Sequence, residues 1–142
     1  MMPIMQEILD NGGEVRFTVT GNSMFPMLRH GKDIVVLKKA PRRLKRYDIP
    51  LFQRDNGKFI LHRIIRVHRN SYTICGDNQT HLEHGINDNM IIGVVTGFVK
   101  DGTYTPCEDQ GYRRYVKWRC RSRLFRHYGT KLKQIWSKLY GN

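Results

Sequence analysis

One tight-turn segment, Asp55–Lys58 (Asp-Asn-Gly-Lys), separates two short apolar runs and strongly constrains how the chain can fold. Asn-Gly readily adopts positive φ angles and is typical of the turns that join antiparallel strands. The flanking runs, Ile49–Gln53 and Phe59–His68, are rich in the β-branched and aromatic residues that favour strands. The sequence therefore predicts a β-hairpin here, and we expect Pro50 to place its first strand at a sheet edge.

Short runs of this kind, separated by turn residues, recur through the first 109 residues. Alternating or continuously apolar patterns predict further strands at Val15–Thr20, Ile34–Leu37, Tyr72–Cys75 and Met90–Val99. The segment Thr80–Asn89 is polar and is expected to be irregular, whereas Pro3–Asn11 predicts a short helix that ends at two glycines. Together these patterns indicate a mainly β, antiparallel domain with a short N-terminal helix.

The C-terminal residues differ from the rest in both charge and periodicity. From Gln110 onward the chain holds ten of its 25 Lys and Arg residues and none of its 12 Asp and Glu residues. From Ser122 the apolar residues recur at helical spacing, which predicts a basic amphipathic helix. We therefore expect a β domain over residues 1–109 and a basic helical tail over residues 110–142.

The charge of this tail points to an anionic partner. Basic and aromatic residues over 112–140 are suited to an anionic membrane surface, although the apolar face of the helix would equally pack back on the β domain. No recognisable nucleic-acid reader motif is present, so we do not expect nucleic acid to be the partner. The residue pattern does not indicate an oligomeric state.

The sequence also bears on where the protein is found. No apolar run approaches the roughly 20 residues that span a bilayer, and the first residues lack the basic start and long apolar stretch of a secretory signal. The three cysteines, Cys75, Cys107 and Cys120, match no disulfide framework, which favours a reducing compartment. These features predict a cytoplasmic protein, peripheral at a membrane if the tail binds lipid.

One serine lies in a segment suited to chemistry. Ser23 follows a Gly-Asn turn and precedes Pro26, so we expect an exposed loop that presents its hydroxyl. A serine nucleophile needs a base, and His62 lies within an otherwise apolar run. Hairpin geometry would bring Asp77, in the turn after the next strand, near His62. The structural alternatives remain open: a turn-capping serine, a structural histidine and an Asx-turn aspartate.

Four motifs occur in a recognisable order: Ser23-Met24-x-Pro26, Gly31-x-Asp33, His62-Arg63-Ile64 and Gly76-Asp77-Asn78. In this order and spacing, residues 14–100 resemble the catalytic domain of the type I signal peptidases. The resemblance is to the branch that uses histidine as general base, found in archaea, the endoplasmic reticulum and some bacteria. The serine–lysine branch and the related repressor-type self-cleaving proteases would carry lysine where His62 stands.

The resemblance implies a role for each motif residue. Ser23 would be the nucleophile, with its backbone N–H in the oxyanion site, and His62 the general base. Asp77 would orient the imidazole or hold the local structure, and either Glu83 or Asp88 would be a second acidic residue. The family needs no cofactor. A metal is not expected either, because no further ligand completes a closed zinc site with Cys75, His81 and His84.

The resemblance predicts a serine endopeptidase that cleaves an extended signal- or leader-type peptide. The alternative is a catalytically inactive relative that binds peptides or membranes through the same scaffold. Two departures from the family are visible. Residues Tyr47–Pro50 stand where the family usually shows Gly-Asp-Ile-Val, and the transmembrane anchor that is usual in the family is not predicted.

Overall fold

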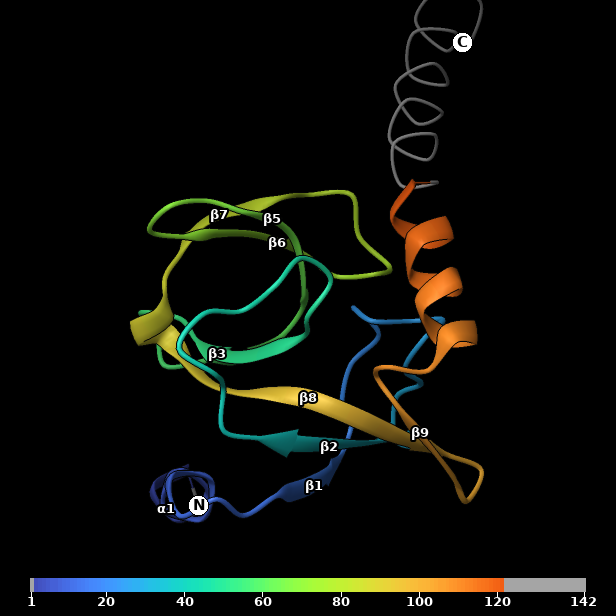
Figure 1. The fold of residues 1–142 in the computed structure, drawn as a ribbon, viewed down its shortest axis with the longest axis horizontal. Coiled ribbons are helices and arrows are strands. Elements are labelled where there is room, and N and C mark those ends of the chain that lie inside the picture. Colours follow the sequence, from blue (N-terminus) through green and yellow to red (C-terminus); the bar gives the residue numbers. More distant parts are fainter. Residues whose placement is uncertain (1, 122–142) are drawn as a thin grey trace, which may run out of the picture.

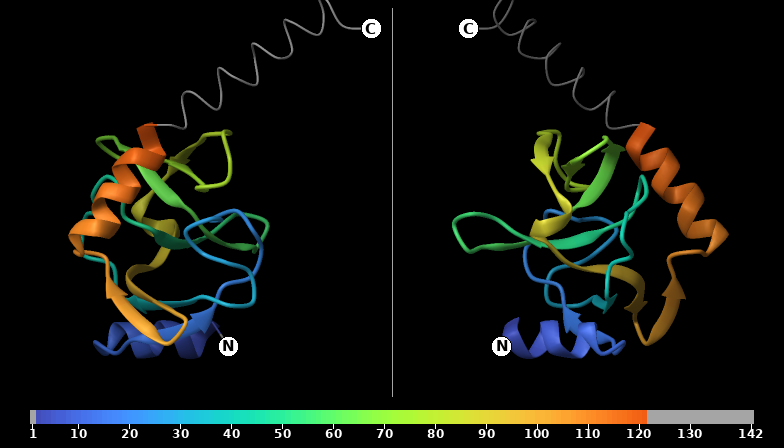
Figure 2. Two further views of the ribbon diagram at one scale, coloured as in Figure 1. Left: turned by 90° about the vertical axis from the view of Figure 1, so that its right-hand side faces the viewer. Right: turned by 60° about the vertical axis from the view of Figure 1, so that its left-hand side comes forward.

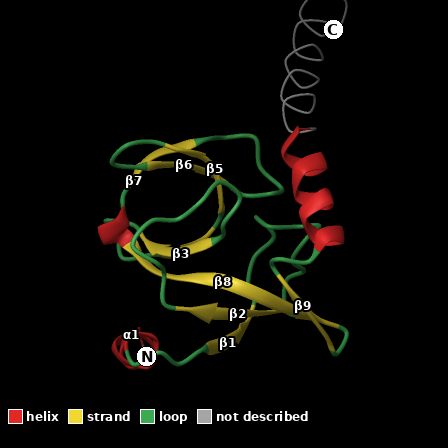
Figure 3. Cartoon of the chain, viewed as in Figure 1, coloured by secondary structure: helices red, strands yellow, loops and turns green. Residues whose placement is uncertain are grey.

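Strands dominate the part of the chain that the computed structural model describes, residues 2–121 (Figures 1 and 3). The strands are β1 (Val15–Thr18), β2 (Ile34–Lys38), β3 (Pro50–Gln53), β4 (Phe59–Leu61), β5 (Arg63–Val67), β6 (Tyr72–Cys75), β7 (Glu83–Ile86), β8 (Ile91–Lys100) and β9 (Thr103–Pro106). A helix, α1 (Met2–Asp10), precedes them, a 3-10 turn, η1 (Asp88–Met90), precedes β8, and residues 110–121 are helical. The mainly β class and the short N-terminal helix are therefore confirmed, and a C-terminal helix is present. The amphipathic stretch predicted from Ser122 onward lies outside the described residues.

The strands form two antiparallel sheets. The larger sheet has the order β1-β2-β8-β3-β4, with β9 also paired to β8, and the smaller sheet has the order β5-β6-β7. The long strand β8 pairs with β2, β3 and β9, and it curves beneath the smaller sheet in Figure 1. Because the larger sheet curls around β8, its two end strands, β1 and β4, approach the same side of the molecule.

The structure corrects three expectations about the strands. Pro50 does not lie at an edge, because β3 is paired on both sides, with β8 and with β4. It is tolerated as the first residue of its strand, a position that proline often occupies. The run Phe59–His68 is not one strand, because the chain leaves the larger sheet after β4 and enters the smaller one at β5. The segment 80–89, expected to be irregular, contains β7 and most of η1.

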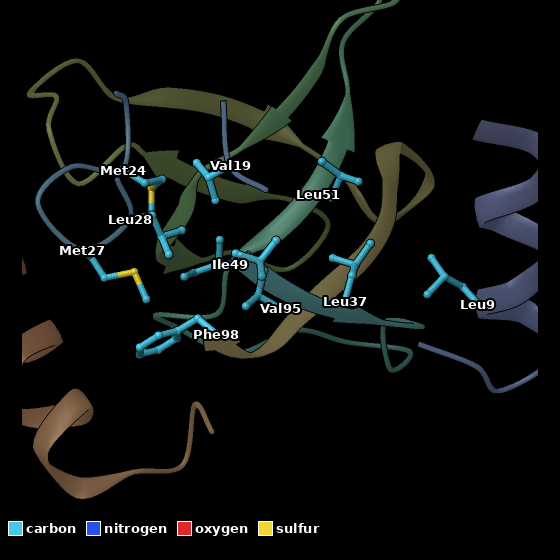
Figure 4. Close-up of a cluster of buried hydrophobic side chains, with 11 residues drawn as sticks. Leu9, Val19, Met24, Met27, Leu28, Leu37, Ile49, Leu51, Val95 and Phe98 are labelled. Atoms are coloured by element: carbon cyan, nitrogen blue, oxygen red, sulfur yellow. The ribbon is translucent and has the colours of Figure 1, made fainter. Parts of the chain in front are cut away.

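A large apolar cluster lies against the curled sheet (Figure 4). Four of its members come from the loop between β1 and β2 rather than from a strand: Val19, Met24, Met27 and Leu28. They pack with strand and helix residues that include Leu9, Leu37, Leu51, Val95 and Phe98. A second cluster joins β3 and β8 to the smaller sheet. The loop between β1 and β2 is therefore anchored by its own apolar side chains.

The helix over residues 110–121 packs against the side of the β domain (Figure 2). Asp109 caps its first turn by accepting a hydrogen bond from the backbone N–H of Tyr112 at 2.9 Å. The Tyr112 ring meets Phe98 edge-on with 5.0 Å between ring centroids, and Val116 is buried. Within residues 2–121, no helix has both the length and the apolar character required to cross a bilayer.

Candidate active site

Ser23 lies in the loop between β1 and β2, as the sequence predicts. Gly21 begins the turn with a φ angle of 81°, a left-handed conformation that glycine adopts without steric cost. The backbone N–H of Gly21 donates a hydrogen bond to Nδ1 of His30 at 2.6 Å, which ties the two ends of the loop together. Met24, directly after the serine, is buried in the core. The backbone at Ser23 is thus held in place while its side chain stays partly exposed.

The turn Gly76–Asn78 packs directly on the backbone of Ser23. The N–H of Asn78 donates to the carbonyl oxygen of Ser23 at 2.8 Å, and the N–H of Asp77 lies 3.4 Å from the Met24 sulfur. A Cβ atom on Gly76 would lie 2.5 Å from the same Ser23 carbonyl oxygen, which explains the need for glycine. Two motifs far apart in the sequence therefore form one unit.

His62 is the residue at which the chain passes from β4 to β5. It is 6% exposed, and its Nδ1 is buried with no hydrogen-bond partner among the described residues. Burial is the main cause that lowers the pKa of His62, to about 4; the charge of Arg54 lowers it further, and Glu83 and Asp77 oppose the shift. The imidazole is therefore neutral at pH 7, which is the protonation state that a general base requires.

Ser23 and His62 both line a cavity of about 520 Å³. Its other walls are mostly apolar and come from α1, β1, β3, β4 and the loop between β1 and β2, among them Met5, Phe17, Met24, Leu51 and Phe59. Arg54, in the turn after β3, is the cationic side chain in this lining. The arrangement places a hydroxyl and a neutral imidazole on one largely apolar surface.

Asp77 is engaged on the side of the turn away from this cavity. Its two carboxylate oxygens accept hydrogen bonds from Nε and Nη2 of Arg63 at 2.8 and 2.9 Å, and both side chains are buried. Because Nδ1 of His62 has no hydrogen-bond partner in the described part of the chain, Asp77 does not orient the imidazole through that atom. Of the two roles that the resemblance implies for Asp77, this geometry is compatible with holding the local structure.

Arg63 has further partners at its remaining terminal nitrogen. Nη1 donates to the carbonyl oxygen of Tyr47 at 3.0 Å and to the hydroxyl of Tyr112 at 2.8 Å. Burial lowers the pKa of Arg63, but Tyr112 and Asp77 outweigh it and raise this pKa above its ordinary value. The guanidinium is thus a permanent, fully buried cation with a carboxylate and two oxygen acceptors around it.

The two candidates for a second acidic residue lie in different places. Glu83, at the start of β7, binds Arg54 through both carboxylate oxygens at 2.5 and 3.1 Å, close enough to affect the pKa of His62. Asp88, in η1, accepts from the Tyr72 hydroxyl at 2.5 Å and from Arg43 at 3.1 Å. Neither residue lines the cavity that Ser23 and His62 share.

Sequence reasoning missed two residues near this site, Arg54 and Tyr112. Arg54 follows a strand in a polar hairpin, where an arginine is ordinary, so no local signal marks it. Tyr112 belongs to the C-terminal region, which sequence reasoning treats as a tail. Among the described residues, no group of three or more His, Cys, Asp or Glu side chains is arranged to hold a metal ion.

The structure thus combines a curled β domain with a cavity that a loop serine and a histidine both line. The chain belongs to the Peptidase S24-like family, whose model matches residues 1–96. This is a family of serine peptidases in the superfamily that also contains the signal peptidases, and it implies a protein substrate. No curated protein matches the sequence.

Proposed function

We propose that the protein is a serine endopeptidase in which Ser23 is the nucleophile and His62 is the general base. The observation that carries this proposal is the single cavity lined by both side chains. Membership of a serine-peptidase family supports it independently. The neutral state of His62 at pH 7 is the state in which it can accept the serine proton.

The reaction would proceed in two steps that use the same pair. His62 takes the proton of the Ser23 hydroxyl as Oγ attacks the peptide carbonyl, and returns it to the leaving amine as the C–N bond breaks. A water molecule then attacks the acyl-enzyme as His62 accepts its proton, and His62 returns this proton to Oγ of Ser23 as the ester C–O bond breaks and the new carboxyl end of the peptide leaves. Backbone N–H groups at Ser23 would stabilise the oxyanion.

We propose an extended peptide as the substrate. Within the described residues β1 is paired with β2 and β4 with β3, so each strand has an open edge, and both strands line the cavity. A peptide in extended conformation can add its backbone hydrogen bonds to such an edge. A signal- or leader-type peptide with small side chains before the cut is the finer proposal, by resemblance to the signal peptidases.

A membrane surface is the second proposed partner. On the described part of the C-terminal helix, Arg113, Arg114 and Lys117 are exposed, and Trp118 is 61% exposed. A cationic surface beside an exposed tryptophan is suited to the interface of an anionic bilayer. The protein would then meet membrane-bound substrates while remaining peripheral.

A catalytically inactive, peptide- or membrane-binding relative is the competing function. The observation that favours it is that Nδ1 of His62 has no hydrogen-bond partner among residues 2–121, because a catalytic imidazole usually has a group that orients it. A pKa of about 4 also makes His62 a weak base. This competing function predicts binding to anionic vesicles without any reaction at Ser23.

Labelling with a fluorophosphonate probe distinguishes the two functions. We expect the wild-type protein to be labelled at Ser23 and to cleave peptides, and Ser23→Ala to lose both. His62→Ala should slow labelling by at least a hundredfold, because general-base catalysis contributes about 10²–10⁴-fold. The measurement is the labelling rate, with the modified residue located by mass spectrometry.

Two matched variants control for general effects of losing a serine or a histidine. Ser71 lies in the turn between β5 and β6, and His81 is exposed in the turn before β7. Ser71→Ala and His81→Ala should label at the wild-type rate. A folded wild-type protein that binds vesicles of anionic lipid but never labels at Ser23 would favour the inactive relative.

A further inference from the structure

The helix over residues 110–121 lies beyond the 96 residues that match the family, yet it contacts the turn that supports Ser23. Figure 2 shows this helix running along the side of the β domain. One of its side chains, Arg119, contacts the turn directly, and a second, Tyr112, is connected to it through Arg63. The Tyr112 hydroxyl accepts a hydrogen bond from Arg63 at 2.8 Å, and Nε of Arg119 donates to the carbonyl oxygen of Asp77 at 3.3 Å.

A series of hydrogen bonds leads from these contacts to the backbone of the proposed nucleophile, Ser23. Arg63, held by Tyr112, binds both carboxylate oxygens of Asp77. The next residue, Asn78, donates its backbone N–H to the carbonyl oxygen of Ser23 at 2.8 Å. The helix is therefore connected to the Ser23 backbone through hydrogen bonds of the Arg63 guanidinium, which are charge-assisted and so of the stronger kind, followed by one backbone hydrogen bond from Asn78.

Because Arg63 is buried, loss of its hydrogen bond to Tyr112 is expected to be costly. The side chain of Arg63 is fully buried, and its guanidinium carries five donors that cannot turn to water. Removing one acceptor leaves a buried N–H of a charged group unsatisfied, which costs more than the net value of an ordinary hydrogen bond. The guanidinium can relieve this cost by tilting, and a tilt shifts Asp77 and the turn that contacts Ser23.

We propose that Tyr112 and Arg119 are positioning residues for the proposed active site, and that helix 110–121 is therefore needed for full activity. They act through the turn Gly76–Asn78, which they hold against the Ser23 backbone. Positional errors well below the size of an atom matter at a nucleophile, because the attack requires a near-ideal approach to the carbonyl carbon. This inference rests on the proposed role of Ser23.

The helix offers a matched pair of tyrosines for the test. Tyr112→Phe removes a hydroxyl that accepts from Arg63 and keeps the ring that packs on Phe98. Tyr115→Phe, one turn further along, removes a hydroxyl that is buried without a hydrogen-bond partner among the described residues. Both variants lose one oxygen atom from the same helix, but only the first loses a contact with Arg63.

Two measurements on the full chain test the proposal. The first is catalysis: we expect Tyr112→Phe to lower kcat and the fluorophosphonate labelling rate about tenfold with KM within twofold, and Tyr115→Phe to change neither. The second is amide hydrogen exchange of Asn78 by NMR, which should become about tenfold faster in Tyr112→Phe only. Arg119→Gln should show a smaller change of the same kind.

The readouts separate this inference from the proposed function. Wild-type labelling with no change in the Tyr112→Phe rate would overturn the positioning role, whatever happens to the exchange of Asn78. If the wild type never labels at Ser23, the proposed function fails, and faster exchange of Asn78 in Tyr112→Phe alone would still support the connection to the Ser23 backbone. Equal losses in Tyr112→Phe and Tyr115→Phe would show a general effect of the helix and would overturn the proposal.

Discussion

Two adjacent residues, His62 and Arg63, have opposite surroundings. His62 lines the cavity with Ser23, its Nδ1 has no hydrogen-bond partner within residues 2–121, and burial lowers its pKa to about 4. Arg63 points to the other side of the chain and binds Asp77, Tyr47 and Tyr112 through all three of its nitrogens. The chain crosses from one sheet to the other at this point, so a single backbone segment serves both sides.

The difference separates the side that we propose to be reactive, called the reactive side below, from a supporting side. Fully satisfied buried polar networks make a structure rigid, whereas a buried polar atom without a partner is costly and needs a reason. Natural proteins concentrate such departures from local consistency at functional sites. The contrast therefore suggests that the network around Arg63 stabilises a site in which His62 is held in an unfavourable state.

Breaking the supporting side should have the largest effect. Arg63→Met removes the cation and leaves the Asp77 carboxylate buried without its main partner, and breaking such a pair costs about 3–5 kcal/mol. We expect the free energy of unfolding, measured by urea denaturation, to fall by that amount. The matched control is Arg66→Met on the same strand, where the side chain is exposed and the expected change is within about 0.5 kcal/mol.

If Arg63→Met and Arg66→Met lower the free energy of unfolding by similar small amounts, the contrast between the two sides is wrong. A second variant separates charge from shape. Asp77→Asn keeps the shape of the side chain but removes the negative charge, so it should also be strongly destabilising because it leaves a fully buried cation without a counter-charge.

The reactive side can be probed through the pH dependence of His62. A histidine whose folded-state pKa is lowered contributes stability above its unfolded pKa, near 6.5, and that contribution is lost as the pH falls through about 4. We therefore expect the acidic limb of the kcat/KM profile at a pH near 4, well below the ordinary histidine value. NMR titration of the His62 ring measures the same pKa without requiring activity.

Arg54→Gln sharpens this prediction. Removing the nearby cation and leaving Glu83 without its partner should both raise the pKa of His62, since Arg54 lowers it and Glu83 raises it. The new value should remain below 6.5, because burial is the largest cause of the shift. Arg69→Gln, in the exposed turn after β5, is the matched control and should leave the titration unchanged. An unshifted pKa in Arg54→Gln would remove Arg54 from the explanation.

The same contrast separates what the sequence predicts from what it cannot. The catalytic roles of Ser23 and His62 stay predictions, but the placement of Ser23 in a loop and of Gly76–Asn78 in a turn is predictable, because both belong to short motifs whose turn chemistry is local. The supporting side is not, because the partners of Arg63 lie up to 49 positions away and on different elements. The strand assignment around His62 shows the same limit. The apolar run Phe59–His68 predicts one strand, and only the pairing of β4 with β3 and of β5 with β6 divides it into two.

The C-terminal region shows a related limit. Its charge dominates the sequence pattern, so the sequence predicts a tail that meets an anionic partner. The contact that ties this region to the core depends on Tyr112, a single residue in a basic segment with no periodic signal of its own. Pro50 is a third case, because proline indicates an edge strand or the start of any strand, and only the observed pairing with both neighbours decides between them.

The smallest expected effect concerns Tyr47, on the supporting side. Tyr47 has a φ angle of 77°, in the left-handed region where a side chain costs about 1 kcal/mol or more relative to glycine. The resemblance to the signal peptidases predicts glycine at this position, and the structure explains that preference. Tyr47 is held there because its N–H donates to the carbonyl oxygen of Ile64 at 2.8 Å and its own carbonyl accepts from Arg63.

The side chain offsets part of this strain, since the guanidinium of Arg46 lies 4.8 Å from the centre of the Tyr47 ring. Such a contact at an exposed site contributes about 0.5–1 kcal/mol. We therefore expect Tyr47→Gly to leave the free energy of unfolding nearly unchanged in the wild type, but to raise it by about 1 kcal/mol in an Arg46→Ala background. Urea denaturation of the four proteins in this cycle measures the difference. If Tyr47→Gly instead lowers the free energy of unfolding in the Arg46→Ala background, packing of the Tyr47 ring matters more at this position than backbone strain.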